Sequence, residues 1–132
     1  MSRENVELAK QMVDALARGD VDELVSLVSE DVVWIPARSA VEGAYHGHDG
    51  VRKFCADTAA NFEVFRPEMP SEMRDLGDRV LTVGTIYIRA RGSGIETDIP
   101  VAGIGTFQQG KLTRWEDFRD RHLALEAVGL RE

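Results

Sequence analysis

The stretch RVLTVGTIYIRARGSGIETDIPVAGIGTFQQGKLTRWEDFR, residues 79–119, contains the longest strand-like runs of the sequence. Three runs within it are typical of long strands: residues 79–91, 95–108 and 111–119. Glycine-containing turns of two or three residues separate these runs, and such short links force neighbouring strands to run antiparallel. Residues 79–119 therefore predict the main part of an antiparallel sheet.

The residues before this stretch favour helices. The first 30 residues predict two helices, with Gly19 ending the first and an Asp20–Glu23 capping box opening the second. A third helix is expected to open at His48 or Asp49. A short buried strand is expected at residues 32–35, stopped by Pro36.

Two further segments complete the predicted order. Pro67 and Pro70 restrict their segment to an irregular or edge strand, and residues 120–130 predict a short helix. Early helices and late hairpins indicate one α+β domain over residues 1–132, with helices packed on one face of the sheet. Glycines inside the long strands, Gly84, Gly103 and Gly105, indicate sharp bending there, which would produce a cone with an interior cavity.

Composition excludes several classes of protein. The net charge of −7 argues against binding nucleic acid or an anionic membrane surface. A single cysteine, Cys55, excludes an intrachain disulfide and a cysteine-based zinc site. The N-terminal residues lack the apolar core of a signal peptide, so we expect a cytoplasmic protein. Thirteen arginines against three lysines indicate GC-rich coding and a bacterial source.

Four stretches, together with the order of elements, resemble the nuclear transport factor 2-like superfamily, and within it the SnoaL-like group that includes polyketide cyclases. The stretches are ARGD (17–20), EDVVW (30–34), YHGHDGV (45–51) and GKLTRWEDF (110–118). The resemblance implies a cone-shaped, cystatin-like α+β barrel whose curved mixed or antiparallel sheet carries three N-terminal helices. It also implies one deep apolar pocket and a homodimer formed through the sheet, but no particular reaction.

Ketosteroid isomerase and limonene-1,2-epoxide hydrolase are more distant relatives, and their catalytic residues can be sought here. The isomerase positions correspond to Met12, Pro36 and Gly103, none of which can do that chemistry. The hydrolase positions correspond to Gly84, Ile86, Trp34, Pro36 and Asp117. Of these positions only 117 carries an acid. We therefore expect neither ketosteroid isomerisation nor epoxide hydrolysis by the residues that those enzymes use.

Asp117 is the candidate catalytic base. Side chains alternate along a strand, so Trp115, Asp117 and Arg119 share one face, which the resemblance places in the pocket. A carboxylate among apolar side chains has its pKa raised toward the range of a general base. The alternative is that Asp117 pairs with Arg119 or Arg114 at the pocket rim.

Three weaker catalytic candidates, Tyr45, His46 and Arg119, could polarise a ligand carbonyl. His46 and His48 are two residues apart, but no third ligand at suitable spacing is visible, so no metal site is expected. The expected ligand-binding residues are Met12, Leu16, Trp34, Phe54, Thr58, Ile86, Ile88, Val101, Gly103 and Trp115.

This lining suits a hydrophobic small molecule. The sequence has no phosphate loop or dinucleotide motif, so no cofactor is expected. Two functions remain open at this point. One is a cofactor-independent cyclase, isomerase, lyase or hydrolase with Asp117 as its base. The other is a non-catalytic module that binds a small ligand or dimerises.

Overall fold

The elements of the computed structural model follow the predicted order closely. The model describes residues 2–37 and 43–130. In chain order the elements are α1 (Ser2–Arg18), α2 (Val21–Ser26), β1 (Val28–Ile35), β2 (Tyr45–His46), α4 (Gly47–Asn61), β3 (Phe62–Pro67), β4 (Glu72–Asp75), β5 (Arg79–Ala90), β6 (Glu96–Gln108), β7 (Lys111–Phe118) and α5 (Arg121–Ala127). None of the described helices is long and apolar enough to cross a lipid bilayer.

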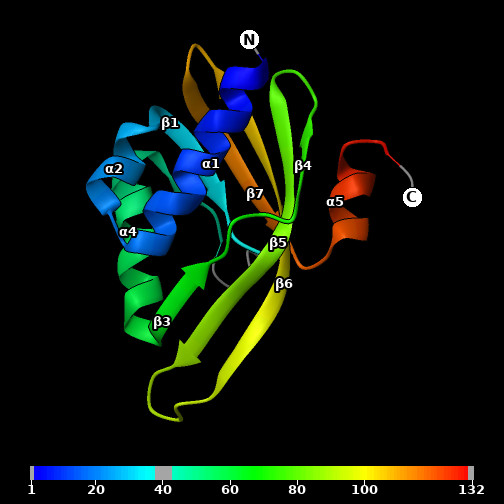
Figure 1. Ribbon diagram of the computed structural model, residues 1–132. Coiled ribbons are helices and arrows are strands. Elements are labelled where there is room, and N and C mark those ends of the chain that lie inside the picture. The colour runs from blue at the N-terminus through cyan, green and yellow to red at the C-terminus, as the bar shows by residue number, and fades with distance from the viewer. Residues whose placement is uncertain (1, 38–42, 131–132) are drawn as a thin grey trace.

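The strands form one curved mixed sheet. Its order is β2-β1-β7-β6-β5-β3, and β4 also pairs with β5. β1 and β7 pair in parallel, whereas the hairpins β5–β6 and β6–β7 are antiparallel as the turns predicted. Figure 1 shows the sheet curling around α1 and α4. This confirms the α+β class and the cone-shaped sheet.

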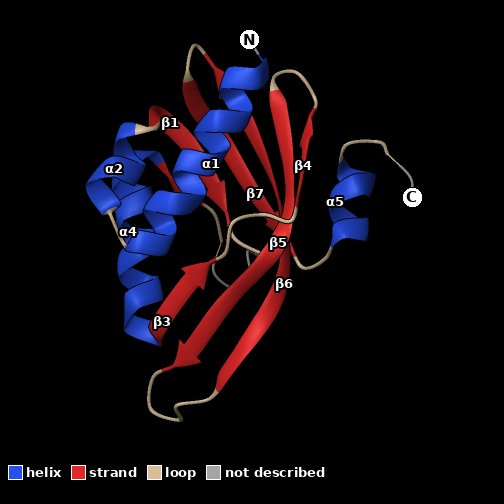
Figure 2. Cartoon of the chain, viewed as in Figure 1, coloured by secondary structure: helices blue, strands red, loops and turns tan. Residues whose placement is uncertain are grey.

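The two faces of the sheet carry separate apolar cores. α1, α2 and α4 pack on the inner face, and α5 packs on the opposite side (Figure 2). The strand β5 serves both cores, because Val80 belongs to the first and Leu81 to the second. The expectation that all helices share one face is therefore wrong for α5. Its buried Ala124 and Leu125 pack against Leu81, Ala102 and Ile104.

Two strand boundaries differ from the prediction. β1 begins at Val28 rather than at residue 32, and its pairing with β7 shifts register between Val28 and Val33. The polar residues 29–31, which interrupt the apolar pattern of β1, lie within this irregular part of the pairing. The proline-containing segment forms β3, an edge strand ending at Pro67, and additionally β4.

The junction between α1 and α2 is held by Gly19 and by a capping residue. Gly19 has φ +69°, a conformation that glycine adopts without steric cost, and its N–H donates to the Leu16 carbonyl at 3.1 Å. Asp20 caps α2 by accepting from the Glu23 N–H at 3.1 Å, as the capping box predicted. The turn therefore fixes the direction of α2 relative to α1.

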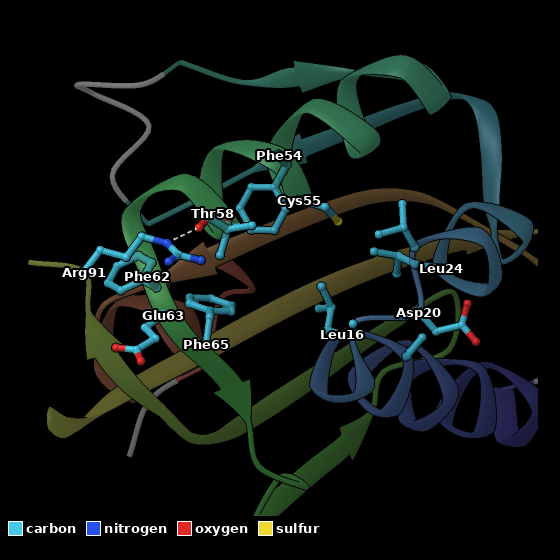
Figure 3. Close-up of a pocket in the computed structure, with 14 residues that line it drawn as sticks. Leu16, Asp20, Leu24, Phe54, Cys55, Thr58, Phe62, Glu63, Phe65 and Arg91 are labelled. Carbon is cyan, nitrogen blue, oxygen red and sulfur yellow. Dashed lines mark hydrogen bonds between the residues drawn. The ribbon is translucent and has the colours of Figure 1, made fainter. Parts of the chain in front are cut away.

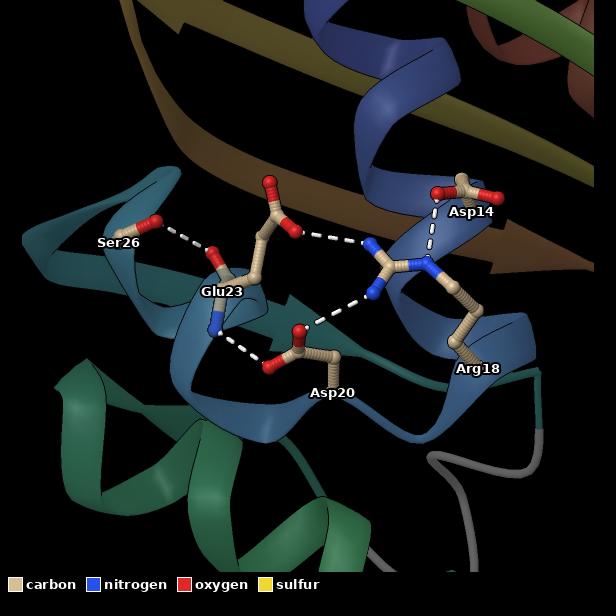
Figure 4. Close-up of polar contacts among 5 residues, drawn as sticks. All are labelled: Asp14, Arg18, Asp20, Glu23 and Ser26. Atoms are coloured by element: carbon tan, nitrogen blue, oxygen red, sulfur yellow. Dashed lines mark hydrogen bonds and ion pairs between the residues drawn. The ribbon is translucent and has the colours of Figure 1, made fainter.

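Arg18 links the two helices further (Figure 4). Its guanidinium donates to the carboxylates of Asp14 at 2.8 Å, Asp20 at 3.0 Å and Glu23 at 2.8 Å. Single exposed ion pairs contribute little to stability, but one arginine shared by three carboxylates forms a network. This network joins the two helices at the end of α1 that carries Leu16.

Candidate functional site

Asp117 lies near the end of β7 and accepts a hydrogen bond from a tryptophan. The Nε1–H of Trp115 donates to Asp117 Oδ1 at 2.8 Å, since side chains two residues apart share one face of the strand. Within the described residues no arginine or lysine forms an ion pair with Asp117. Arg114 instead binds Glu116 at 3.1 Å, and Arg119 is exposed. The described residues thus do not support the alternative in which Asp117 pairs with Arg119 or Arg114 at the pocket rim.

The surroundings of Asp117 favour its protonated form. The pKa of the carboxyl is raised from about 3.8 to about 7, mainly by burial and to a smaller extent by the nearby Glu116 charge. The hydrogen bond from Trp115 lowers the same pKa and is outweighed by burial. The pKa of Asp117 is thus raised toward neutral pH, the range that suits a general base.

The indole of Trp115 occupies space left by two glycines on β6. A Cβ at Gly103 would lie 2.9 Å from Cε2 of Trp115, and one at Gly105 would lie 2.9 Å from its Cε3. Gly103 and Gly105 are the register partners of Asp117 and Trp115. These glycines allow the indole to lie close against β6, so they serve its packing rather than only bending the strand.

Trp115 also stacks on Trp34. The two residues are register partners in the parallel β1–β7 pair, and their rings lie 5.9 Å apart at an interplanar angle of 24°. Trp34 further contacts Phe54 of α4, with ring centroids 5.4 Å apart. An aromatic cluster from two strands and one helix therefore adjoins Asp117.

An inner cavity of about 50 Å³ lies beside Asp117. Its lining is mostly apolar, with Asp117, Glu68 and two threonines as its polar side chains. The residues that line it are Val13, Leu16, Trp34, Phe54, Phe65, Pro67, Glu68, Pro70, Thr82, Gly84, Thr85, Ile86, Val101, Gly103, Trp115 and Asp117. The volume is enough for one or two small groups, since liquid water takes about 30 Å³ per molecule.

An outer cavity of about 230 Å³ lies between the end of α1, α2, α4 and β3 (Figure 3). Leu16, Leu24, Phe62 and the half-buried Cys55 give it an apolar wall, and burial raises the pKa of the Cys55 thiol. Arg91 lies at the cavity and donates from Nε to the Ala59 carbonyl at 2.7 Å.

The two cavities share three lining residues, Leu16, Phe54 and Phe65. These side chains come from α1, α4 and β3, so three elements form the partition between the cavities. Sequence reasoning predicted a single pocket; the structure has an inner cavity at Asp117 and an adjoining outer one.

Most of the predicted ligand-binding residues line one or both cavities. Leu16, Trp34, Phe54, Ile86, Val101, Gly103 and Trp115 line the inner cavity, whereas Thr58 lines the outer one. Met12 lines neither, because its side chain is fully buried in the core between α1 and the sheet. Ile88 also lines neither, since it lies further toward the β5–β6 turn, opposite Phe65 of β3.

The three weaker catalytic candidates do not line either cavity. The Tyr45 hydroxyl donates to Asp57 of α4 at 2.8 Å, and its ring packs on Phe54. His46 is exposed at the start of α4, and Arg119 is exposed after β7. A polarising role for these side chains would require them to reach past the residues that enclose the cavity.

His48 joins two elements rather than pointing at the cavity. Its Nε2 lies 3.0 Å from the Val28 carbonyl, which ties α4 to β1. The part of the chain that the structure describes has no group of three or more His, Cys, Asp or Glu side chains that could hold a metal ion.

The family assignment rests on a match over most of the chain. Residues 9–115 match the SnoaL-like domain. The chain belongs to the SnoaL-like family. Among curated proteins, this SnoaL-like chain is 28% identical over 116 residues to the uncharacterized proteins Rv0034 of Mycobacterium tuberculosis and Mb0035 of Mycobacterium bovis. The alignment covers 86% of this chain and 87% of each relative.

Solved structures agree with the fold of this SnoaL-like chain. A nuclear transport factor 2-like protein of unknown function from Burkholderia pseudomallei superposes with a TM-score of 0.80 at 24% identity, covering 96% of both chains. TerC co-crystallized with polyporic acid superposes with a TM-score of 0.79 at 25% identity, covering 95% of this chain and 97% of TerC. A cystatin fold protein from Novosphingobium aromaticivorans gives a TM-score of 0.74 at 26% identity, with 87% and 97% covered.

Proposed function

We propose that this SnoaL-like protein binds a hydrophobic, oxygenated small molecule, and that Asp117 removes a proton from it as a general base. The observation that carries the proposal is the Asp117 carboxyl, whose pKa is raised to about 7 beside an apolar cavity. Such a base accepts a proton from an activated C–H or from water at neutral pH without a cofactor. The reaction class is a cyclisation, isomerisation, elimination or hydrolysis.

The two cavities suggest how a ligand would be held. The outer cavity would hold an apolar body, and the inner cavity has room for only a small reacting group next to Asp117. The similarity to TerC, a structure obtained with polyporic acid, supports an organic ligand in this fold.

The proposal is tested with 2-tetralone, a two-ring ketone with acidic C–H bonds beside its carbonyl. We expect the protein to accelerate exchange of these hydrogens for deuterium, measured by NMR in D₂O. Asp117→Asn should lower the enzyme-catalysed rate by about 100-fold or more. Asp98→Asn, at an exposed position of β6, is the matched control and should leave the rate unchanged.

The pH dependence provides a second measurement of the same proposal. A general base acts when deprotonated, so the exchange rate should rise with pH to a plateau, with a midpoint near the Asp117 pKa of about 7. A pH-independent rate, or one that Asp117→Asn leaves intact, would contradict the role of Asp117.

A non-catalytic ligand-binding module is the second candidate. The position of Tyr45, His46 and Arg119 outside both cavities favours it, because it leaves Asp117 without the polarising partners first expected. This candidate predicts that 2-tetralone or polyporic acid raises the melting temperature by binding the native state. It also predicts that no exchange above background is observed.

We further propose that the chain forms a homodimer through its sheet. The β5–β6 hairpin extends beyond the helices in Figure 2 and leaves Ile95 65% exposed. Sedimentation equilibrium at micromolar concentration should give twice the chain mass of 14.7 kDa. A mass equal to that of one chain would contradict the dimer.

A further inference from the structure

The two tryptophans of the chain form a stacked pair whose two N–H groups differ. The N–H of Trp115 is bound to Asp117 at 2.8 Å. The Nε1 atom of Trp34 is buried and has no hydrogen-bond partner among the described residues, although Trp34 is only 1% exposed. The pair therefore presents one satisfied indole donor and one unsatisfied one.

An unsatisfied buried donor is uncommon and requires a reason. Buried polar groups almost always find a partner, because the loss of their water is otherwise not compensated. Trp34 Nε1 is the one buried side-chain nitrogen or oxygen that lacks a partner in the described part of the chain. Phenylalanine would avoid this cost, so the ring contacts of Trp34 account for its packing but not for its unpaired N–H.

The Trp34 ring lines the same inner cavity as Asp117. Both side chains therefore border the space of about 50 Å³ that a group entering this cavity would occupy. The other buried polar side chain there, Thr82, directs its hydroxyl toward the Gly103 carbonyl at 3.5 Å. Among the described residues that line this cavity, Trp34 thus carries the buried donor that has no partner.

We propose that the Trp34 Nε1–H donates a hydrogen bond to a carbonyl oxygen of the ligand while Asp117 acts on the neighbouring carbon; this rests on the proposed function. The ligand class is then a carbonyl compound with an acidic C–H next to the carbonyl. Asp117 takes the proton, forming its O–H bond as the C–H bond breaks. The C–H electron pair forms the carbon–carbon double bond of an enolate, and the carbonyl π pair moves onto the oxygen that Trp34 holds.

The role of Trp34 is that of an oxyanion donor, and its position suits it. Charge develops on the carbonyl oxygen as the proton leaves, and a fixed donor in an apolar cavity stabilises that charge without reorganising. The stacking on Trp115 and the contact with Phe54 fix the Trp34 ring before the ligand enters. The donor is therefore preorganised. Trp115, the register partner of Trp34, also holds Asp117 by its hydrogen bond.

Indole resonances test this directly, because the chain has two tryptophans and so two Nε1–H signals in a ¹H–¹⁵N spectrum. The signal of Trp34 is identified by its contact with the Phe54 ring and by its loss in Trp34→Phe. Titration of the unaltered protein with 2-tetralone should move the Trp34 signal downfield. Tetralin, which has the same rings without the carbonyl, should not move it in that direction.

Affinity provides the matched measurement. Trp34→Phe should weaken binding of 2-tetralone about tenfold more than it weakens binding of tetralin, the difference expected for one hydrogen bond. In Asp117→Asn the downfield movement of the Trp34 signal should persist, even though exchange is lost. The movement of the Trp34 signal therefore tests the role of Trp34 even if Asp117 is not the base.

Two results would overturn the inference. One is a Trp34 signal that stays in place up to the solubility limit of 2-tetralone. The other is an equal loss of affinity for 2-tetralone and tetralin in Trp34→Phe, which would show that the ring matters only for packing.

Discussion

Gly103→Ala is expected to lower the free energy of unfolding by about 3 kcal/mol, near the upper end of the usual cost of overpacking a core. A Cβ at this position would lie 2.9 Å from Cε2 of Trp115 and closer still to Cζ2. The indole cannot move away cheaply, because it is 5% exposed and stacked on Trp34. Urea unfolding followed by tryptophan fluorescence measures the loss.

Gly84→Ala is the matched control for this substitution. Gly84 lies on the neighbouring strand β5 and lines the same inner cavity, but its added Cβ would approach nothing closer than the Pro70 Cα at 3.3 Å. We expect a smaller loss of stability there. In a Trp115→Phe background the cost of Gly103→Ala should also fall, because phenylalanine lacks the second fused ring. Equal costs in both backgrounds would contradict the explanation.

Asp117→Asn is expected to stabilise the protein at pH 8 by about 2 kcal/mol and to have little effect on stability at pH 4. The folded protein holds the Asp117 proton with a pKa of about 7, against about 3.8 for the unfolded chain. One pKa unit corresponds to about 1.4 kcal/mol of stability. The expected change of about 2 kcal/mol is about half of what the full pKa shift would give, because the Asp117 side chain is partly exposed.

The direction of this pH effect follows from which state binds the proton more tightly. Below pH 4 both states are protonated, so Asp117 imposes no penalty. Between about pH 4 and pH 7 the unfolded chain releases this proton while the folded protein still holds it, so stability falls relative to Asp117→Asn over that window and levels off above pH 7. Unfolding of both proteins at pH 4 and pH 8 measures the difference, with Asp98→Asn as the exposed control. Parallel pH profiles for wild type and Asp117→Asn would contradict the raised pKa.

Local signals account for the parts of the fold that sequence predicted well. The turns at residues 92–94 and 109–110 determine the antiparallel hairpins, and the Asp20–Glu23 capping box determines where α2 begins. The side of the sheet taken by α5 was predicted wrongly. Its apolar residues fit either face, and only the pairing of β5 with β6 shows that Leu81 and Ala102 face away from α1.

The candidate site was predicted only in part. The alternation along β7 was sufficient to place Trp115 and Asp117 on one face, and the same spacing could have suggested the bond between them. The unpaired N–H of Trp34 could not be predicted. It depends on the parallel pairing of β1 with β7 and on ring orientation, neither of which has a local signal in the sequence.

The parallel pairing of β1 with β7 also bears on how the chain folds. Trp34 and Trp115 come from opposite ends of the chain, so their pairing closes a long loop, an entropic cost that slows folding. During synthesis β1 must wait, with an unpaired edge, until β7 has emerged. The inner cavity, which both tryptophans line, is therefore complete only once β7 has paired with β1.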